Sequence, residues 1–296
     1  MTTSLVTGGC GFIGSHIADK LVSMGHKVIV IDDLSAPEND NFYFNDQASY
    51  HKLDVSIDDC SHLFVGVDYV FHLAARSRIQ PTIGSPSECF EVNVIGTQRV
   101  LEWSRMNSVK RFVYSGTSSL YGHQNAIPFQ TNMPSDCLNP YSMSKWMAEQ
   151  VCKLYSQLYG LNSTVLRYFN VYGEREPTKG KYAPVIGLFK RQKISGRPIT
   201  IVGDGSQRRD FTHVDDVVRA NILSMSLSEQ NKFSVYNVGT GKNYSINQIA
   251  DMIGGNKVYI DKRPAEVLET LADISLTTKD LKWRPIVSLE NVINSY

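Results

Sequence analysis

Residues 4–15 read SLVTGGCGFIGS, an apolar strand that runs directly into a glycine turn and the start of a helix. Gly8, Gly11 and Gly14 carry no side chains, so the turn can be tight and a phosphate can approach the backbone amides at the positive end of the helix. A strand, a glycine turn and a helix in this order are typical of a dinucleotide-binding site. The stretch therefore predicts a βαβ unit that holds the pyrophosphate of a dinucleotide.

The rest of the chain extends this unit into a sheet. Ile13, Ile17 and Leu21 lie four residues apart and form one apolar stripe of a helix. Runs rich in Val, Ile and Phe recur between segments of helical periodicity. The expected strands are residues 4–7, 27–31, 68–72, 111–115, 164–168 and 234–238. This alternation predicts an α/β fold, with a Rossmann-type doubly wound parallel sheet covered by helices.

A second, smaller region is expected after about residue 172. The charged stretch EREPTKGK is followed there by a segment punctuated with Pro and Gly and by shorter elements. We expect a mixed α/β substrate-binding domain made of about residues 172–209 and 242–296. Residues 1–171, with about 210–241, would form the dinucleotide-binding domain.

The composition is that of an ordinary globular protein, with 42% hydrophobic and 20% charged residues among 296. The 30 basic and 29 acidic side chains are spread along the chain, which argues against nucleic acid or a membrane surface as a partner. No apolar run approaches the roughly 18 residues that a membrane span needs, and the first strand begins too early for a signal peptide.

The number and spacing of the cysteines indicate whether the protein resides in a reducing or an oxidising compartment. The cysteines are odd in number, widely spaced and without CxxC pairs, which argues against a disulfide framework or a metal site. They are Cys10, Cys60, Cys89, Cys137 and Cys152. We therefore expect reduced thiols, no bound metal and a cytoplasmic location.

An acidic residue closes the second expected strand. The Asp32 carboxylate can accept hydrogen bonds from the adenosine ribose hydroxyls and would repel a 2′-phosphate. Asp33 adds a second negative charge, and no basic residue follows until Lys52. NAD is therefore favoured over NADP. Asp54, after the third strand, could reach the adenine edge or could equally cap a turn or a helix.

A tyrosine and a lysine stand four apart in YSMSK, directly after Pro140. Tyr141 and Lys145 therefore project from one face at the start of a helix. A tyrosine has a reference pKa of about 10, so a nearby ammonium and a positive nicotinamide would be needed to favour the phenolate as a base. The pair is a candidate catalytic site.

Just before this pair, the strand at 111–115 ends in GTSSLYG. Thr117, Ser118 and Ser119 thus come at the carboxyl edge of the sheet, where ligands of open α/β folds bind. The other interpretation of such a run is a plain turn.

These motifs together resemble the extended short-chain dehydrogenase/reductase family, the NAD-dependent epimerases and dehydratases. The resemblance covers nearly the whole chain and rests on TGGxGFIGS, Asp32, FHLAA, NVIGT, the hydroxyl loop, YxxxK, RYFNVYG, GDGSQRRDF and NVGTG, in the family's order. The chain is most similar to UDP-glucose and UDP-N-acetylglucosamine 4-epimerases. In these, a tyrosine takes the C4 hydroxyl proton while hydride passes to NAD, and the 4-keto sugar turns over and takes hydride back on its other face.

The resemblance implies roles for individual residues. Tyr141 would be the base, Lys145 its tuner and a ribose ligand, and Thr117 the hydroxyl that hydrogen-bonds O4. The implied cofactor site comprises Gly8, Gly11, Phe12, Ile13, Gly14, Asp32, Asp33, Asp54, Val55, Leu73, Ala74, Ala75, Asn93, Ser115, Tyr141, Lys145 and Tyr168. The implied substrate site comprises Ser118, Ser119, Asn170, Arg209, Arg263, Glu266 and Thr270.

Within the substrate set, Asn170, Arg209 and Arg263 match positions that hold the nucleotide diphosphate, for which a guanidinium is well suited. Glu266 matches an acid that binds the uridine ribose. The chain also departs from the family, which often has Pro, Gln and Gly at three positions. Here these are Glu174, Glu176 and Ala265, which could reshape the nucleotide pocket.

Other residues favour one member of the family over another. Related dehydratases and decarboxylases need carboxylic acids where this chain has Ser118 and Ser119, which favours simple epimerisation. Asn170 stands where uronic-acid epimerases usually have Thr, which favours a neutral hexose. Thr270 aligns with a gate that is bulky in epimerases restricted to UDP-glucose, so a small residue there predicts that UDP-GlcNAc is accepted.

Alternatives of other classes stay open. A sugar dehydratase or another NAD-dependent oxidoreductase comes second, and a non-enzymatic NAD sensor third. The family resemblance also implies a homodimer through paired helices. Met147, Val151, Leu154 and Leu158 form an apolar stripe after Tyr141 that would face the partner, unless it is buried within the monomer.

Overall fold

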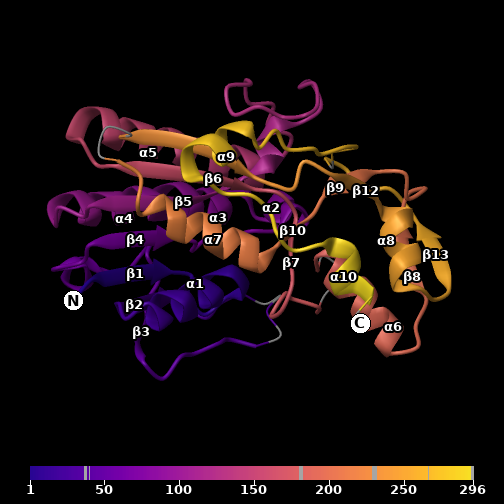
Figure 1. Cartoon of the computed structure of the whole chain (residues 1–296), viewed down its shortest axis with the longest axis horizontal. Helices are drawn as coiled ribbons and strands as arrows, with labels where there is room; N and C mark the ends of the chain where they lie inside the picture. Colours follow the sequence, from indigo (N-terminus) through magenta and orange to yellow (C-terminus); the bar gives the residue numbers. More distant parts are fainter. Residues whose placement is uncertain (37–38, 40, 180–182, 229–231, 266, 295–296) are drawn as a thin grey trace.

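A seven-stranded sheet forms the centre of the computed structural model (Figure 1). The structure describes residues 1–36, 39, 41–179, 183–228, 232–265 and 267–294. The order is β11-β6-β5-β4-β1-β2-β3, and every neighbouring pair is parallel. The strands are β1 (Thr3–Thr7), β2 (Lys27–Asp32), β3 (Ala48–Lys52), β4 (Tyr69–His72), β5 (Arg111–Thr117), β6 (Ser163–Tyr168) and β11 (Phe233–Val238). The doubly wound fold expected from the sequence is confirmed.

Six of these strands correspond to the apolar runs found in the sequence, because helices bury both of their faces. β3 is different. It lies at the edge of the sheet, reads ASYHK and contains no Val, Ile or Phe.

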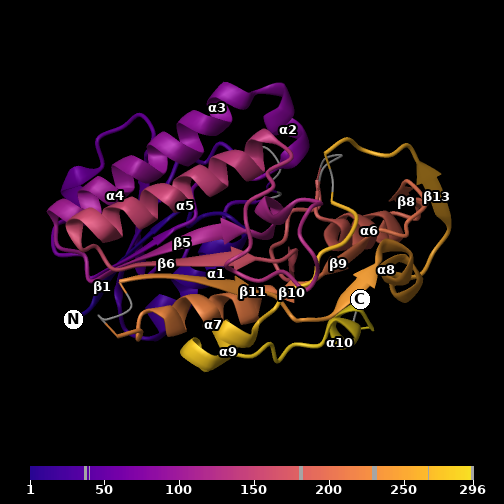
Figure 2. The same cartoon turned by 90° about the horizontal axis from the view of Figure 1, so that it is seen from above.

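Helices cover both faces of the sheet (Figure 2). On one face lie α2 (Ile79–Gly84), α3 (Pro86–Phe90), α4 (Gly96–Met106) and α5 (Pro140–Tyr159). On the other lie α1 (Phe12–Ser23), α7 (Val214–Ser224) and α9 (Ser275–Leu281). Each face has its own buried apolar cluster, centred on residues such as Leu101 and Cys152 or Ile17 and Val217. Within the described ranges, no helix is both long and apolar enough to cross a bilayer.

The second region is built from short elements beside the sheet. It contains α6 (Val185–Ile194), α8 (Ile246–Ile253), α10 (Leu289–Asn294), β8 (Ile199–Val202) paired with β13 (Lys257–Ile260), and β9 (Arg208–Asp210) paired with β12 (Asn243–Ser245). β7 (Val171–Tyr172) and β10 (Thr212–His213) pair near its junction with the sheet.

This region has a core of its own, which includes Phe189, Ile201 and Ile249. The C-terminal segment, however, returns to the sheet. Leu281 and Trp283 belong to the apolar cluster of the α1–α7 face. The domain division drawn from the sequence stays a proposal, and this segment contributes to both regions.

A buried ion pair fixes α5 to the sheet. Arg167 of β6 donates two hydrogen bonds to the Glu149 carboxylate, at 3.0 Å from Nε and 2.6 Å from Nη2. Its Nη1 also donates to the Tyr121 hydroxyl, at 2.7 Å, which in turn donates to Asn237. Because both charges are paired in bidentate geometry, their burial is compensated. The network orients the helix that carries Tyr141.

Candidate active site

The turn after β1 leaves no room for side chains at two of its glycines. Gly8 has a φ of +68°, and a Cβ there would lie 2.7 Å from the amide nitrogen of Ala74. A Cβ on Gly14 would lie 2.2 Å from the carbonyl oxygen of Gly8. Gly11 precedes α1 and makes no side-chain cap, so the first amides of the helix have no competing side chain. The turn has the form that a pyrophosphate requires.

A cleft of about 490 Å³ opens at the carboxyl edge of the sheet. Most of the residues suggested by the sequence meet in it. They are Gly8, Gly11, Phe12, Ile13, Gly14, Asp32, Asp33, Asp54, Val55, Leu73, Ala74, Ala75, Ser115, Thr117, Ser118, Ser119, Tyr141, Lys145, Tyr168, Asn170, Arg209, Arg263 and Thr270. Glu266 lies outside the described residues, and Asn93 does not line the cleft.

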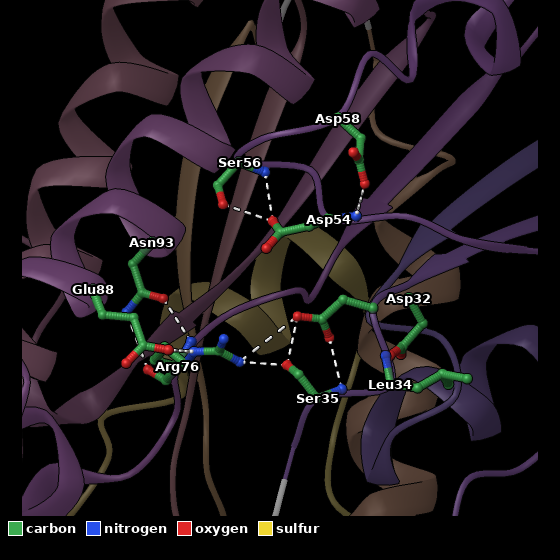
Figure 3. Close-up of polar contacts among 10 residues, drawn as sticks. Asp32, Leu34, Ser35, Asp54, Ser56, Asp58, Arg76, Glu88 and Asn93 are labelled. Carbon is green, nitrogen blue, oxygen red and sulfur yellow. Dashed lines mark hydrogen bonds and ion pairs between the residues drawn. The ribbon is translucent and has the colours of Figure 1, made fainter.

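Asp32 stands at the end of β2, next to Leu34 (Figure 3). Both of its carboxylate oxygens accept hydrogen bonds from backbone amides. One accepts from the amide of Leu34 and the other from the amide of Cys10, each at 2.9 Å. Burial raises the pKa of Asp32, and these two amides lower it. A carboxylate offers about four lone-pair sites, so two remain for ribose hydroxyls.

For Asp54 the sequence left two interpretations open, a turn and a contact with the adenine edge. One carboxylate oxygen accepts from the amide and the hydroxyl of Ser56, at 2.8 and 2.6 Å, so Asp54 does fix a turn. The residue also lines the cleft. Contact between Asp54 and the adenine stays a prediction.

The start of α5 places the tyrosine and the lysine. Asn139 and Ser142 form a reciprocal capping box, and Pro140 occupies the first helical turn. Tyr141 therefore projects from the first turn and Lys145 from the next. The Lys145 ammonium lies 4.3 Å from the centroid of the Tyr114 ring, and burial lowers the pKa of Lys145 to about 7.

Opposing influences act on the Tyr141 phenol. Burial raises its pKa above the ordinary value, while a hydrogen bond with Thr117 and the positive charge of Arg78 lower it. Thr117 is well placed because it ends β5 and caps the short helical turn Ser118–Tyr121. Arg78 is thus a cation of this site beyond the expected Lys145.

Asn93 has an indirect position. It lies in the π-helical turn Glu91–Ile95, a feature often found near functional sites. Its side chain donates to Ser144 Oγ at 2.9 Å and accepts from the backbone amide of Arg76 at 2.7 Å. Asn93 thereby joins the residue before Lys145 to the segment after β4. Direct contact with the cofactor stays a prediction.

The residues expected to bind substrate also contact one another. The Asn170 amide donates to the Asp210 carbonyl at 2.8 Å and to Thr270 Oγ1 at 3.2 Å, so it braces Thr270. Arg209 and Arg263 line both this cleft and an adjoining cavity of about 150 Å³. Two guanidinium groups at the junction of two cavities suit a diphosphate that spans them.

The departures from the family have visible structural consequences. Ala265 has a φ of +58°, a left-handed conformation in which glycine is favoured and an alanine is strained. Glu176 is buried against Gly187 of α6, and burial raises the pKa of Glu176 to about 8. Glu174, in contrast, is exposed.

Several polar residues of the cleft were not identified from the sequence. Arg76, Arg78, Ser35, Asn39 and Gln80 also line it. A signal existed for the two arginines, because they directly follow FHLAA at the carboxyl end of an expected strand. Nothing local marks Asn39 or Gln80.

The model of the NAD dependent epimerase/dehydratase family matches residues 4–239. The chain belongs to the NAD-dependent epimerase/dehydratase family. UDP-glucuronate 4-epimerase of Thermodesulfobacterium geofontis is 34% identical over 310 residues, 97% of this chain and 92% of that protein. UDP-glucose 4-epimerase of Mycolicibacterium smegmatis is 32% identical over 298 residues, with 97% and 94% covered. The crystal structure of Thermotoga maritima UDP-glucose 4-epimerase with UDP-glucose gives a TM-score of 0.91 at 33% identity, with 99% of this chain and 96% of that one covered.

NAD is accordingly the cofactor of this family member. The glycine turn fits its pyrophosphate, and the lone pairs of Asp32 fit its ribose hydroxyls. No basic residue follows the second strand until Lys52, as the sequence shows. The structure adds that Arg76 reaches across from the segment after β4, with its Nη1 3.8 Å from the Asp33 carboxylate.

The buried Glu176 predicts a particular pH dependence of stability. A carboxyl with a higher pKa in the folded than in the unfolded protein holds its proton more tightly when folded. The free energy of unfolding should therefore fall as the pH rises from about 4.5 to about 8. Glu176→Gln should remove this contribution and be more stable than the wild type by roughly 3–5 kcal/mol at pH 8. Urea unfolding of both proteins across this pH range measures the difference in the free energy of unfolding. If the curves of unfolding free energy against pH run parallel for the two proteins, Glu176 is ionised in the folded wild type.

Proposed function

We propose that the enzyme interconverts the C4 epimers of a UDP-hexose through a 4-keto intermediate, with NAD as a cofactor that is regenerated in each cycle. The observation that carries this proposal is the meeting of Thr117, Tyr141 and Lys145 in the same cleft as the glycine turn. Ser118 and Ser119 stand beside them and cannot act as carboxylic acids. Tyr141 is a candidate base, NAD would supply the hydride acceptor, and these two serines supply no acid for elimination.

The residues of the chain divide the chemistry. Tyr141 takes the proton from the C4 hydroxyl, and the Thr117 hydroxyl, already hydrogen-bonded to Tyr141, holds that oxygen. Arg78 favours the charged phenolate, and Lys145 does so when it carries its proton. NAD, when bound, would supply the acceptor and donor of the C4 hydride. The same tyrosine gives the proton back once the sugar has turned over.

The adjoining cavities suggest how the nucleotide lies. With the sugar near Tyr141, the diphosphate meets Arg209 and Arg263, and the base enters the smaller cavity. That cavity is lined by apolar side chains such as Leu188 and Phe189 and by the amide of Gln207. The Thermotoga maritima relative was crystallised with UDP-glucose, which supports this class of substrate.

A neutral sugar is the first choice because Asn170 occupies the position that is usually Thr in uronic-acid epimerases. The second candidate is a UDP-hexuronate. One observation favours it: the Arg78 guanidinium lines the cleft close enough to influence Tyr141 and offers a partner for a carboxylate. The relative from Thermodesulfobacterium geofontis is a UDP-glucuronate 4-epimerase.

The same proposal includes N-acetylated sugars. Thr270 lines the cleft and is small, and its hydroxyl accepts from Asn170 and from the amide of Asp210. A tyrosine in its place would project into the space that an N-acetyl group needs.

We also propose a homodimer. In α5, the side chains of Met147, Leu154 and Leu158 are exposed by 37%, 48% and 64%. These three residues are therefore not buried within the monomer, which was the alternative that the sequence left open. α4 lies beside α5 and exposes Met106 (Figure 2). Two such helix pairs related by a two-fold axis would bury this surface. The five free cysteines are consistent with the proposed cytoplasmic location.

The function is tested by incubating the purified enzyme with UDP-glucose, UDP-GlcNAc and UDP-glucuronate in turn and resolving the products by chromatography. We expect the galacto isomers of the first two, without net formation of NADH. Tyr141→Phe should lower kcat by about 10²–10⁴-fold, because the base is lost. Tyr159→Phe, on the exposed end of α5, is the control. Stoichiometric NADH or an accumulating 4-keto product would instead indicate a dehydrogenase or a dehydratase.

The gate is tested by Thr270→Tyr. It should abolish activity on UDP-GlcNAc while UDP-glucose is still epimerised, because only the acetylated sugar needs the space. Thr270→Ser keeps the hydroxyl that Asn170 contacts and should act on both sugars. Equal activity of Thr270→Tyr on both substrates would show that residue 270 is no gate.

The dimer is tested by sedimentation velocity. The double variant Leu154→Glu, Leu158→Glu should sediment as a monomer, because it places charges in the proposed interface. Ile194→Glu, at a still more exposed apolar site on α6, should leave the dimer intact. A monomeric wild-type protein would contradict the proposal.

A further inference from the structure

Arg76 connects two separate elements at the adenosine end of the cleft (Figure 3). Its Nη1 donates to Ser35 Oγ at 2.6 Å and lies 3.8 Å from an oxygen of Asp33. Its Nε donates to Glu88 Oε1 at 2.8 Å. One guanidinium thus holds the loop after β2 on one side and α3 on the other.

The segment that Arg76 contacts, residues 33–35, lines the cleft. Asp33, Ser35 and Asn39 all line it, as does Arg76 itself. Asp33 and Ser35 are also joined to each other, because the amide and the hydroxyl of Ser35 both donate to the Asp33 carboxylate. Asp33 and Ser35 therefore contact Arg76 as one preformed pair.

The backbone of Arg76 is fixed from behind. The Asn93 side chain accepts from the Arg76 amide at 2.7 Å and donates to the Arg76 carbonyl at 3.1 Å. The side chains that form these contacts are nevertheless partly exposed to solvent, by 28% for Arg76, 30% for Asp33 and 53% for Glu88. Ion pairs this exposed are individually weak and can open without disturbing the fold. The backbone of Arg76 is thus fixed, while its side-chain contacts can open and close.

We infer that Arg76, Ser35, Asp33 and Glu88 form a clasp that retains the dinucleotide between catalytic cycles. The adenosine end of NAD would lie between Asp32 and Asp54, beneath the loop that Arg76 ties down. The cofactor leaves only after the Arg76 contacts break, so the clasp slows dissociation. The inference rests on NAD binding and is independent of which sugar is the substrate.

Release of NAD from the loaded enzyme tests the clasp without any sugar. Loaded protein is mixed with lactate dehydrogenase and excess lactate, and NADH forms as NAD dissociates. Arg76→Leu should release NAD about tenfold faster than the wild type, because both sides of the clasp are lost together. Ser35→Ala and Glu88→Gln should each accelerate release several-fold, since each loosens one side.

Two controls separate the clasp from other effects. Arg105→Leu removes an Arg–Glu pair of similar exposure on α4, away from the cleft, and should leave the release rate unchanged. Thermal unfolding of each apo variant shows whether the fold is intact. Ser35→Ala should have little further effect in the Arg76→Leu background, because both changes act through one contact.

An unchanged release rate in Arg76→Leu overturns the inference. So does fast release in Arg76→Leu with normal release in both Ser35→Ala and Glu88→Gln, because Arg76 would then hold the nucleotide directly rather than through the clasp. Failure of the epimerase assay with normal NAD retention would count against the proposed substrate alone.

Discussion

The close approach of the first turn to its neighbours is the constraint on which the site depends. Gly8 and Gly14 fit only because neither has a side chain, since a Cβ on either would overlap the backbone of Ala74 or of Gly8. This contact brings the end of β1, the start of α1 and the end of β4 together. The amides of the turn and the segment that carries Arg76 are positioned by the same packing.

Parallel strands extend this local constraint across the molecule. Because their carboxyl ends share one edge, residues after β1, β2, β4, β5 and β6 converge on a single cleft. α5 then has to lie in one orientation for Tyr141 to meet Thr117. The buried pair of Arg167 and Glu149 supplies that orientation, since a bidentate contact between a strand and a helix leaves little freedom of rotation.

The cleft is divided by charge in a way that matches a dinucleotide and a nucleotide sugar. The carboxylates of Asp32 and Asp54 line the cleft together with the basic side chains Lys145, Arg209 and Arg263. In the proposed arrangement the carboxylates would meet the ribose of NAD, and the basic groups would meet the sugar and the diphosphate of the substrate. Hydroxyl groups bind well to carboxylates, and phosphates bind well to guanidinium groups. Arg76 is an exception, because it is a cation on the acidic side of the cleft. Its ion pairs with Asp33 and Glu88 explain how a positive charge is tolerated there.

The sequence by itself determined the features that depend on neighbours along the chain. The glycine turn, the strands buried on both faces and the four-residue spacing of Tyr141 and Lys145 are local patterns with one structural outcome, so the fold, the family and most of the cleft could be predicted. The polar edge strand β3 was weakly marked, because it has little apolar surface to bury.

Only the tertiary structure decided the contacts between distant segments. Asn170 meets Thr270 across 100 residues, Arg76 meets Ser35 across 41, and Asn93 proved to brace the site rather than line it. The elevated pKa of Glu176 likewise follows from its burial against α6. These features depend on strand order, on register and on which surface a helix covers, and no short stretch of sequence contains that information.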